Sequence, residues 1–193
     1  MSSIIRADTI QDLSGNNIIN ESGNTITIGA SGDTTNIIGT LQNNGASVGG
    51  ANTPAFFATV GYAQSISDAT YTKLNFDTVV FNSGEFISGG SHKFTPAVVG
   101  KYLISLQVAM DEIDDQKRIE ARIYKNGSAV SRAATVASVS GGSSFPHTST
   151  NGFIIDFDAD DYIEGYVYHN HGSSRNIRAS SETYFGAYKL IGV

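Results

Sequence analysis

The chain has 193 residues, a formal net charge of −6, only 16% charged residues and no cysteine. This composition excludes disulfides and thiolate metal sites, and without a Lys/Arg run we expect no nucleic-acid partner. No apolar stretch is long enough for a membrane helix, and the first residues, MSSIIRADTIQDLSG, lack the apolar core of a secretory signal. We therefore expect a protein made in the cytoplasm that does not insert into membranes. Its 21 glycines suit short strands and many turns.

Residues 1–52 form the first of two expected domains and contain no aromatic residue. A weak repeat of turn triplets recurs after eight and then nine residues, at Ser14-Gly15-Asn16, Ser22-Gly23-Asn24 and Ser31-Gly32-Asp33. Each triplet precedes a short segment that contains isoleucine. Such short strands become stable when they stack or when several chains wrap a common axis, so we predict a short, β-rich, intertwined stem. A flexible polar tail remains the alternative.

We predict that this stem attaches the protein to a larger assembly. The apolar residues expected to make the attachment are Ile4, Ile5, Ile10 and Leu13. Residues 41–52 are rich in Gly, Asn and Ser and predict a neck. Within the neck, Gly45-Ala46-Ser47-Val48-Gly49 matches the nucleophile pattern G-x-S-x-G, which requires a preceding strand and a following helix. The segment 52–54, Asn-Thr-Pro, follows instead, so we expect no catalytic serine and no enzyme.

Residues 53–193 form the second expected domain, in which apolar and polar residues alternate with period 2. Two segments, 101–110 and 118–125, have the clearest pattern and are predicted to be the central antiparallel pair. An acidic turn, 111–116, lies between them, and Asn126-Gly127 is a strong turn dipeptide. Many short strands separated by turns predict an all-β sandwich or jelly roll. The other expected strands are 55–60, 74–81, 86–87, 92–99, 152–157, 161–169 and 182–193, with one weak strand within 131–150.

Seven short motifs in this domain occur in an order that resembles the globular head of the complement and tumour-necrosis-factor jelly-roll superfamily. They are Pro54-Ala55-Phe56, Phe81-Asn82, Lys93-Phe94-Thr95, Gly100-Lys101-Tyr102, Lys125-Asn126-Gly127, Asp161-Tyr162-Ile163 and Phe185-Gly186-Ala187-Tyr188-Lys189-Leu190. His92 and Asp160 stand where the family pattern has glycine. The resemblance implies a ten-stranded jelly-roll sandwich that forms a homotrimer.

The N-terminal segment, about residues 4–46, carries a second resemblance, to the short leader of tail-fibre and other virion proteins of marine bacteriophages. A phage leader joined to a complement-type head implies a virion fibre with a terminal knob.

The first resemblance also implies that both termini lie at one end of the head, the base, and that ligands would meet the other end, the apex. Counting antiparallel strands back from the last one predicts that the acidic loops 111–116 and 158–161 lie at the base. It places loops 131–150 and 169–181 at the apex, with few acids. Candidate ligand-binding residues at the apex are His147, Tyr168, His169, His171, Arg175 and Arg178.

Arginines suit anionic glycans or phosphates, and tyrosines can stack on sugars. Packing within the sandwich or the trimer is the alternative for Tyr166, Tyr168 and Tyr184, and solvated loop charge is the alternative for the arginines. His169 and His171 are spaced as possible metal ligands, and two acidic runs, 111–115 and 156–161, could attract calcium. Neither matches a complete ligand set, so we expect no metal and no cofactor.

The sequence therefore favours a non-enzymatic phage tail fibre or knob, located in the virion. Its expected partners are itself, other virion proteins through the stem, and a host surface glycan or protein through the apex. A purely structural head or tail fibre, without receptor binding, is the alternative. A free carbohydrate-binding or signalling module is the third possibility.

Overall fold

The computed structural model describes residues 9–11, 13–15, 17–22, 25–28, 31–39, 41–43, 46–47, 52–138, 147–149 and 152–191. The chain divides into two compact units, residues 1–49 and 50–193. All assigned elements in the described ranges are strands, and no helix there could cross a membrane.

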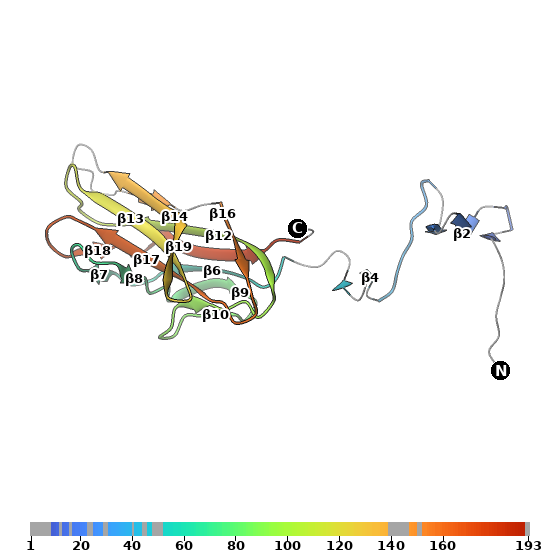
Figure 1. Ribbon diagram of the computed structural model, residues 1–193, viewed down its shortest axis with the longest axis horizontal. Helices are drawn as coiled ribbons and strands as arrows, with labels where there is room; N and C mark the ends of the chain where they lie inside the picture. Colours follow the sequence, from blue (N-terminus) through green and yellow to red (C-terminus); the bar gives the residue numbers. More distant parts are fainter. Residues whose placement is uncertain are drawn as a thin grey trace. The chain divides into compact units, whose positions relative to one another are not determined.

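The N-terminal unit contains a three-stranded antiparallel meander of β1 (Thr9–Gln11), β2 (Asn17–Ser22) and β3 (Thr25–Ile28), and a small hairpin of β4 (Gln42–Asn43) and β5 (Ala46–Ser47) (Figure 1). Ser14 and Gly15 of the first predicted turn triplet lie between β1 and β2, whereas Ser22 of the second triplet is the last residue of β2. Several of the apolar side chains described in this unit are exposed: Ile10 is 45% exposed and Leu13 fully so. Ile26, Ile28 and Ile38 are also exposed. Ile4 and Ile5, the other predicted attachment residues, lie outside the described residues.

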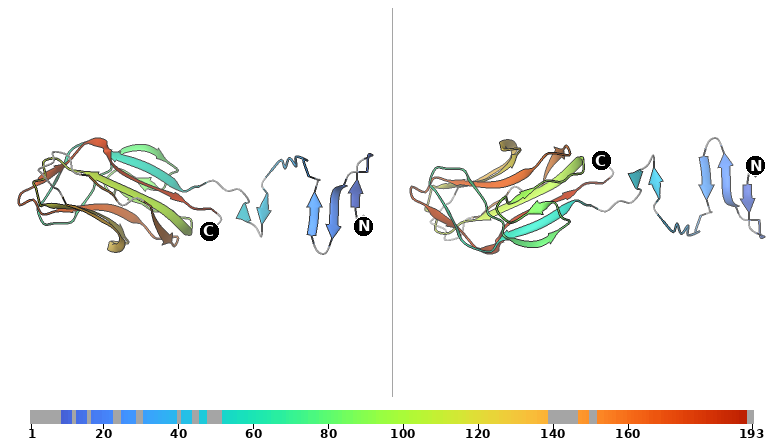
Figure 2. Two further views of the ribbon diagram at one scale, coloured as in Figure 1. Left: turned by 90° about the horizontal axis from the view of Figure 1, so that it is seen from above. Right: turned by 90° about the horizontal axis from the view of Figure 1, so that it is seen from below.

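The head is a sandwich of two antiparallel sheets, which the two views of Figure 2 show as separate layers. The first, which we name the β12 sheet, has the strand order β15-β12-β19-β6-β9, with β16 following β15 along the free edge of β12. The second, the β17 sheet, has the order β10-β11-β17-β13-β14, with β8 also paired to β17. Two further strands, β7 and β18, pair beside the sandwich.

The strands of the β12 sheet are β6 (Ala55–Val60), β9 (Thr78–Asn82), β12 (Gly100–Ala109), β15 (His147–Ser149), β16 (Phe153–Phe157) and β19 (Ser180–Lys189). Those of the β17 sheet are β8 (Thr72–Lys73), β10 (Phe86–Ile87), β11 (Lys93–Phe94), β13 (Arg118–Lys125), β14 (Ser128–Ser138) and β17 (Ile163–His169). The side pair is β7 (Gln64–Ile66) and β18 (Arg175–Ile177). The described part of the head thus has more strands than the ten expected, because several segments of two or three residues also pair.

An aromatic cluster joins the two sheets. Phe56 of β6 stacks on Phe86 of β10 with 4.4 Å between ring centroids, and lies 4.6 Å from Phe94 of β11 and 4.9 Å from Phe185 of β19. All four rings are buried. Because each sheet contributes two rings, the cluster holds the sheets face to face and fixes which face of each strand points inward.

The prediction that segments 101–110 and 118–125 pair with each other is wrong. Segments 101–110 and 118–125 are strands β12 and β13, but β12 pairs with β19, β15 and β16, whereas β13 pairs with β14 and β17. Both strands do face one core, as their alternation predicted, because Ile104 and Ile123 are fully buried. Period 2 identifies the buried face of a strand but not its hydrogen-bonded neighbour, and residues 110–117 cross from one sheet to the other.

The direction of these two strands also differs from the prediction. We define the base as the end where Lys189 N donates to Pro54 O at 3.1 Å, and the apex as the opposite end. Tyr102 lies opposite Lys189, so β12 starts at the base and ends at the apex. The ε-amino group of Lys125 donates to Asp156 O at the base, so β13 runs toward the base.

Consequently the acidic loop 111–116, expected at the base, lies at the apex. Asn126-Gly127, expected to lead to the apex, lies at the base. Loops 158–161 and 169–181 lie at the ends predicted for them, because β16 and β17 run in the expected directions.

Asp161 ties together two turns at the base. Asn126 and Gly127 have φ values of 52° and 73°, as a two-residue hairpin turn between β13 and β14 requires. The carboxylate of Asp161 accepts hydrogen bonds from Asn126 Nδ2 at 2.6 Å, Lys125 Nζ at 2.6 Å and Asp158 N at 2.7 Å. The hydrogen bond from Lys125, followed by those from Asp158 and Asn126, lowers the pKa of Asp161 from 3.8 to about 2.

Replacing Asp161 with asparagine should remove a pH-dependent part of the stability. Because the folded-state pKa lies below the unfolded one, this contribution is complete above about pH 4 and disappears as the pH falls toward 2. We expect Asp161→Asn to lower the free energy of unfolding by about 1–2 kcal/mol at pH 7 and by progressively less below pH 4. Urea denaturation of both proteins between pH 2 and 7 measures this. A difference that does not change with pH would contradict the assignment.

Candidate functional site

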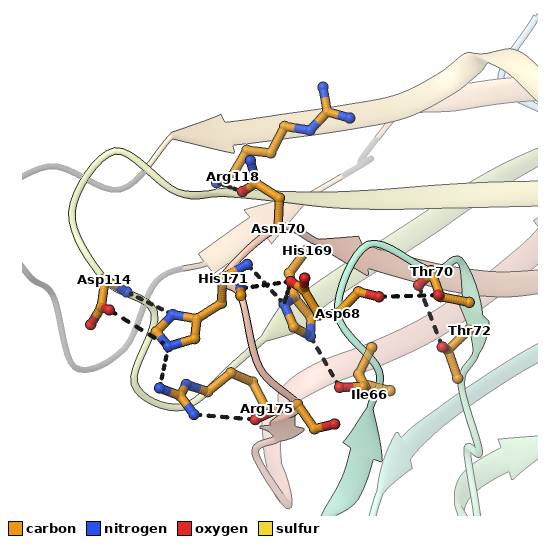
Figure 3. Close-up of polar contacts among 12 residues, drawn as sticks. Ile66, Asp68, Thr70, Thr72, Asp114, Arg118, His169, Asn170, His171 and Arg175 are labelled. Carbon is orange, nitrogen blue, oxygen red and sulfur yellow. Dashed lines mark hydrogen bonds and ion pairs between the residues drawn. The ribbon is translucent and has the colours of Figure 1, made fainter.

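The apex brings together polar side chains from three segments that are distant in the sequence (Figure 3). We name Asp68, Asp114, His169, His171 and Arg175 the apex cluster. His169 ends β17, Asp114 belongs to the loop after β12, and Asp68 follows β7. Backbone bonds hold these segments together: Asp111 N donates to Asn176 O at 3.0 Å, and β18 pairs with β7.

His169 is fully buried and acts as a structural link. Its Nδ1 accepts a hydrogen bond from His171 N at 3.3 Å, so Nε2 carries the proton and donates to Ile66 O at 3.1 Å. Asp68 Oδ1 lies 3.6 Å from Nδ1 and accepts a bond from Gly172 N at 2.7 Å. A ligand in solvent cannot reach this imidazole without opening the loops that it connects.

His171 lies between the carboxylate of Asp114 and the guanidinium of Arg175, and only 8% of its surface is exposed. Its Nδ1 accepts from Asp114 N at 3.3 Å, and its Nε2 is 3.6 Å from Asp114 Oδ2 and in contact with Arg175 Nη2. Arg175 also donates from Nε to Glu112 O at 2.8 Å and from Nη1 to Ser174 O at 3.1 Å. The arginine therefore directs its donors at neighbouring loop atoms.

The apex is richer in acids than the sequence indicated. Loop 111–116 lies here and brings Asp114 to within 3.6 Å of His171, and Asp111 and Glu112 to the same pocket as Arg175. A shallow pocket of about 170 Å³ is lined by Arg175 together with Asp111, Glu112, Ser174 and Asn176. An anionic ligand would meet two carboxylates and one guanidinium in it. The charge distribution thus opposes anion binding at the apex cluster.

The remaining predicted ligand residues lie apart from the cluster. Tyr168 projects from the outer face of the β17 sheet, with its ring 5.1 Å from that of Tyr71. Arg178 Nε is 3.8 Å from Glu182 Oε2. His147 begins β15 and lies opposite Ala109 by its backbone, while its side chain is outside the described residues. In the described part of the chain, no group of three or more His, Asp or Glu side chains is arranged to hold a metal ion.

A second candidate site is the outer face of the β12 sheet, where apolar side chains form a continuous surface. Leu103 lies opposite both Ile154 and Tyr188, and Phe57 lies opposite Phe81. Ile154, Phe81 and Tyr188 are 59%, 53% and 39% exposed. We name this set the apolar face: Phe57, Phe81, Leu103, Ile154, Tyr184 and Tyr188.

Gly186 makes room for the central ring of the apolar face. It lies opposite Phe57, and a Cβ atom at Gly186 would come within 2.8 Å of Phe57 Cδ2. The ring lies across the glycine and 5.2 Å from Tyr184. An aromatic residue supported in this way on the solvent side of a sheet is typical of an interface.

Sequence reasoning missed the apolar face although a signal was present. Phe56 and Phe57 are adjacent in one strand, so one of the two rings must point away from the core. Leu103 and Ile154 also lie at positions of their strands that alternate with the core-facing residues, where polar side chains are expected. Reading both faces of each strand, rather than only the more apolar one, finds this surface. The contacts within the apex cluster had no comparable signal, because Asp68, Asp114 and His171 come from three separate loops.

Comparison with known proteins supports the fold. No protein-family model matches the sequence, and no curated protein sequence matches it. Among solved structures, murine APRIL at pH 8.5 matches with a TM-score of 0.52 and 15% identity, over 70% of this chain and 98% of the other. Eiger TNF from S. frugiperda matches with a TM-score of 0.51 and 11% identity, over 72% and 93%. The globular domain of the zebrafish complement 1qA protein has a TM-score of 0.49 at 14% identity, over 71% and 96%.

At these identities the matches concern the fold. They confirm the resemblance that the seven motifs indicated for residues 53–193, and none of them concerns the phage-like leader. The head of this chain has the fold of the tumour-necrosis-factor-like jelly-roll domains.

Proposed function

We propose that the chain is a homotrimeric, non-enzymatic fibre protein of a bacteriophage virion. Its N-terminal unit forms the stem that attaches to other virion proteins, and its jelly-roll head is a knob that recognises a host surface. The apolar face carries this proposal, because a soluble single chain gains nothing from exposing three large side chains on the same face of one sheet. Burial against neighbouring copies would remove them from water.

The N-terminal unit supports assembly independently. Its described strands leave Ile10, Ile26 and Ile28 exposed, and a three-stranded meander has no second layer to cover them. Three such units around one axis would supply the missing layer. The assignment to a virion rests on the leader that resembles phage fibre proteins, and the host-surface role on the repetition of one knob surface three times, which adds weak contacts by avidity.

The location of the protein tests the proposal. Antibodies against the full chain, applied to particles of the phage that encodes it, should label fibre tips in electron micrographs and should block adsorption to host cells. Labelling without inhibition of adsorption would favour a purely structural fibre. Particles that carry no label, while infected cells contain the protein, would contradict the virion assignment.

A further inference from the structure

The outer face of the β17 sheet has an aromatic and cationic character that the apex cluster and the apolar face lack. Tyr124 and Tyr166 stack with 3.9 Å between ring centroids. Tyr71, which precedes β8, lies 5.1 Å from Tyr168 and 6.4 Å from Tyr124, so the four rings are continuous. Each ring is partly exposed. We name these four residues the tyrosine face.

Cations lie on the rings. The Arg118 guanidinium is 4.8 Å from the ring centroid of Tyr168, and that of Arg122 is 4.7 Å from Tyr71. At the basal end, Lys93 Nζ is 4.7 Å from the ring of Tyr162. Residues 162 to 168, all but the first of them in β17, connect these ends over a length of about 20 Å. Aromatic and positive groups therefore alternate along an extended surface.

Some cations of the β17 sheet, which also include Lys73 of β8, are neutralised within the protein, and others are not. Lys73 Nζ is 2.8 Å from Glu164 Oε1, and Arg122 contacts the buried Glu120. Arg118 and Lys93 have no carboxylate partner among the described residues. Their charges remain at opposite ends of the tyrosine face, in a protein whose net charge is −6.

The phenols themselves do not repel anions. Burial, together with a hydrogen bond to Glu120, raises the pKa of Tyr71 to about 12, and burial raises the pKa of Tyr166. Both side chains are neutral at physiological pH. Stacked tyrosines offer a large, rigid contact surface that loses little conformational entropy on binding.

The tyrosine face remains accessible in the proposed trimer. It lies on the β17 sheet, whereas the apolar face lies on the β12 sheet, on the other side of the sandwich. Association of chains through the apolar face would leave three tyrosine faces directed outward. A polymer with a repeating unit could contact more than one of them.

Among anionic polymers, an acidic polysaccharide fits this surface best. Sugar rings present flat C–H faces that suit the tyrosine rings, and carboxylates along the same polymer can pair with the cation at each end of this surface. A nucleic acid carries one charge per nucleotide, and its binding depends on many more phosphate contacts than the two unpaired cations among the described residues of this surface could make. We propose that the tyrosine face binds an acidic polysaccharide of the host surface, an inference that gives the proposed knob its ligand class.

Surface plasmon resonance with immobilised polygalacturonate tests this, with neutral dextran as the reference polymer. The full chain should bind polygalacturonate in 50 mM salt, more weakly in 300 mM salt, and dextran hardly at all. Arg118→Gln and Lys93→Gln should each weaken binding about fivefold, the effect of one exposed charge pair at low salt. Lys101→Gln removes the same charge from the other side of the sandwich, where Lys101 is 3.3 Å from Asp156, and should change binding less than twofold.

The outcomes separate this inference from the proposed function. A trimeric chain that does not bind polygalacturonate would overturn the inference and leave the fibre in place. If Lys101→Gln and Arg118→Gln weakened polygalacturonate binding equally, the tyrosine face would be excluded as the binding site. Binding to oligothymidylate that depends on Arg118 and Lys93, without binding to polygalacturonate, would assign the surface to nucleic acid and overturn the polysaccharide. A single-chain mass in sedimentation would contradict the proposed trimer, whatever the binding result.

Discussion

Replacing Phe56 with alanine is expected to lower the free energy of unfolding by about 3–5 kcal/mol, a large fraction of the stability of a typical domain. Phe56 is 1% exposed and contacts rings from both sheets, with Phe86 stacked at an interplanar angle of 2°. The alanine leaves a cavity that rigid strands on both sides cannot close. Urea denaturation at a fixed chain concentration measures the loss.

Phe56→Leu is the matched control, because it retains most of the apolar volume and should cost about 1–2 kcal/mol. Equal losses for the two variants would mean that ring stacking rather than volume holds the sheets together. A loss below 1 kcal/mol for the alanine would contradict the placement of Phe56 between the sheets.

Replacing Ile154 with glutamate should convert the proposed trimer to single chains at micromolar concentration. Ile154 is 59% exposed and lies opposite Leu103 on β16, the edge strand of the apolar face, so the carboxylate costs little in an isolated chain. In the interface it would be buried without a partner, at about 3 kcal/mol or more per copy. That penalty corresponds to a weakening of association of at least about 100-fold.

Ile87→Glu provides the control for this experiment. Ile87 belongs to β10 of the β17 sheet and is 47% exposed, so the chemical change and the exposure are similar. Sedimentation velocity should show an unchanged assembly for Ile87→Glu. If that variant dissociates and Ile154→Glu does not, the chains associate through the β17 sheet, and the tyrosine face would then be covered.

The sequence predicted the strands well because alternation is a local property. Segments 55–60 and 118–125 match β6 and β13 residue for residue, and Asn126-Gly127 forms the expected turn. Segment 74–81 became a strand only from Thr78 onward, although Leu74 and Phe76 are buried as predicted. Alternation reports burial, and burial also occurs in loops that cover the core.

Partners and directions of strands were harder to predict because they depend on contacts between distant residues. The 111–116 loop shows the consequence. Because one pairing was predicted wrongly, two strands were given the opposite direction. Four carboxylates were therefore assigned to the base, and the apex was predicted to have few acids. His92 shows the opposite case: its φ of 43° is favourable for glycine, which the family pattern has at this position, so the motif was a sound guide to backbone shape even where the residue differs.

The candidate site was predicted only in part. His169, His171 and Arg175 are close in the sequence, so they were correctly expected to lie near one another. The burial of His169 and the acids beside Arg175 depend on loops from other parts of the sequence. The tyrosine face was hidden for a related reason. Tyr166 and Tyr168 occur in a visible alternation, whereas Tyr71 and Arg118 join them only through sheet pairing and a loop.

The native mass of the full chain tests the central claim most directly. Sedimentation equilibrium at low micromolar concentration should give three times the 20.4 kDa of one chain, without dependence on rotor speed. A mass of one chain across that concentration range would contradict a trimeric fibre, and would leave the apolar face without the neighbour that the proposal assigns to it.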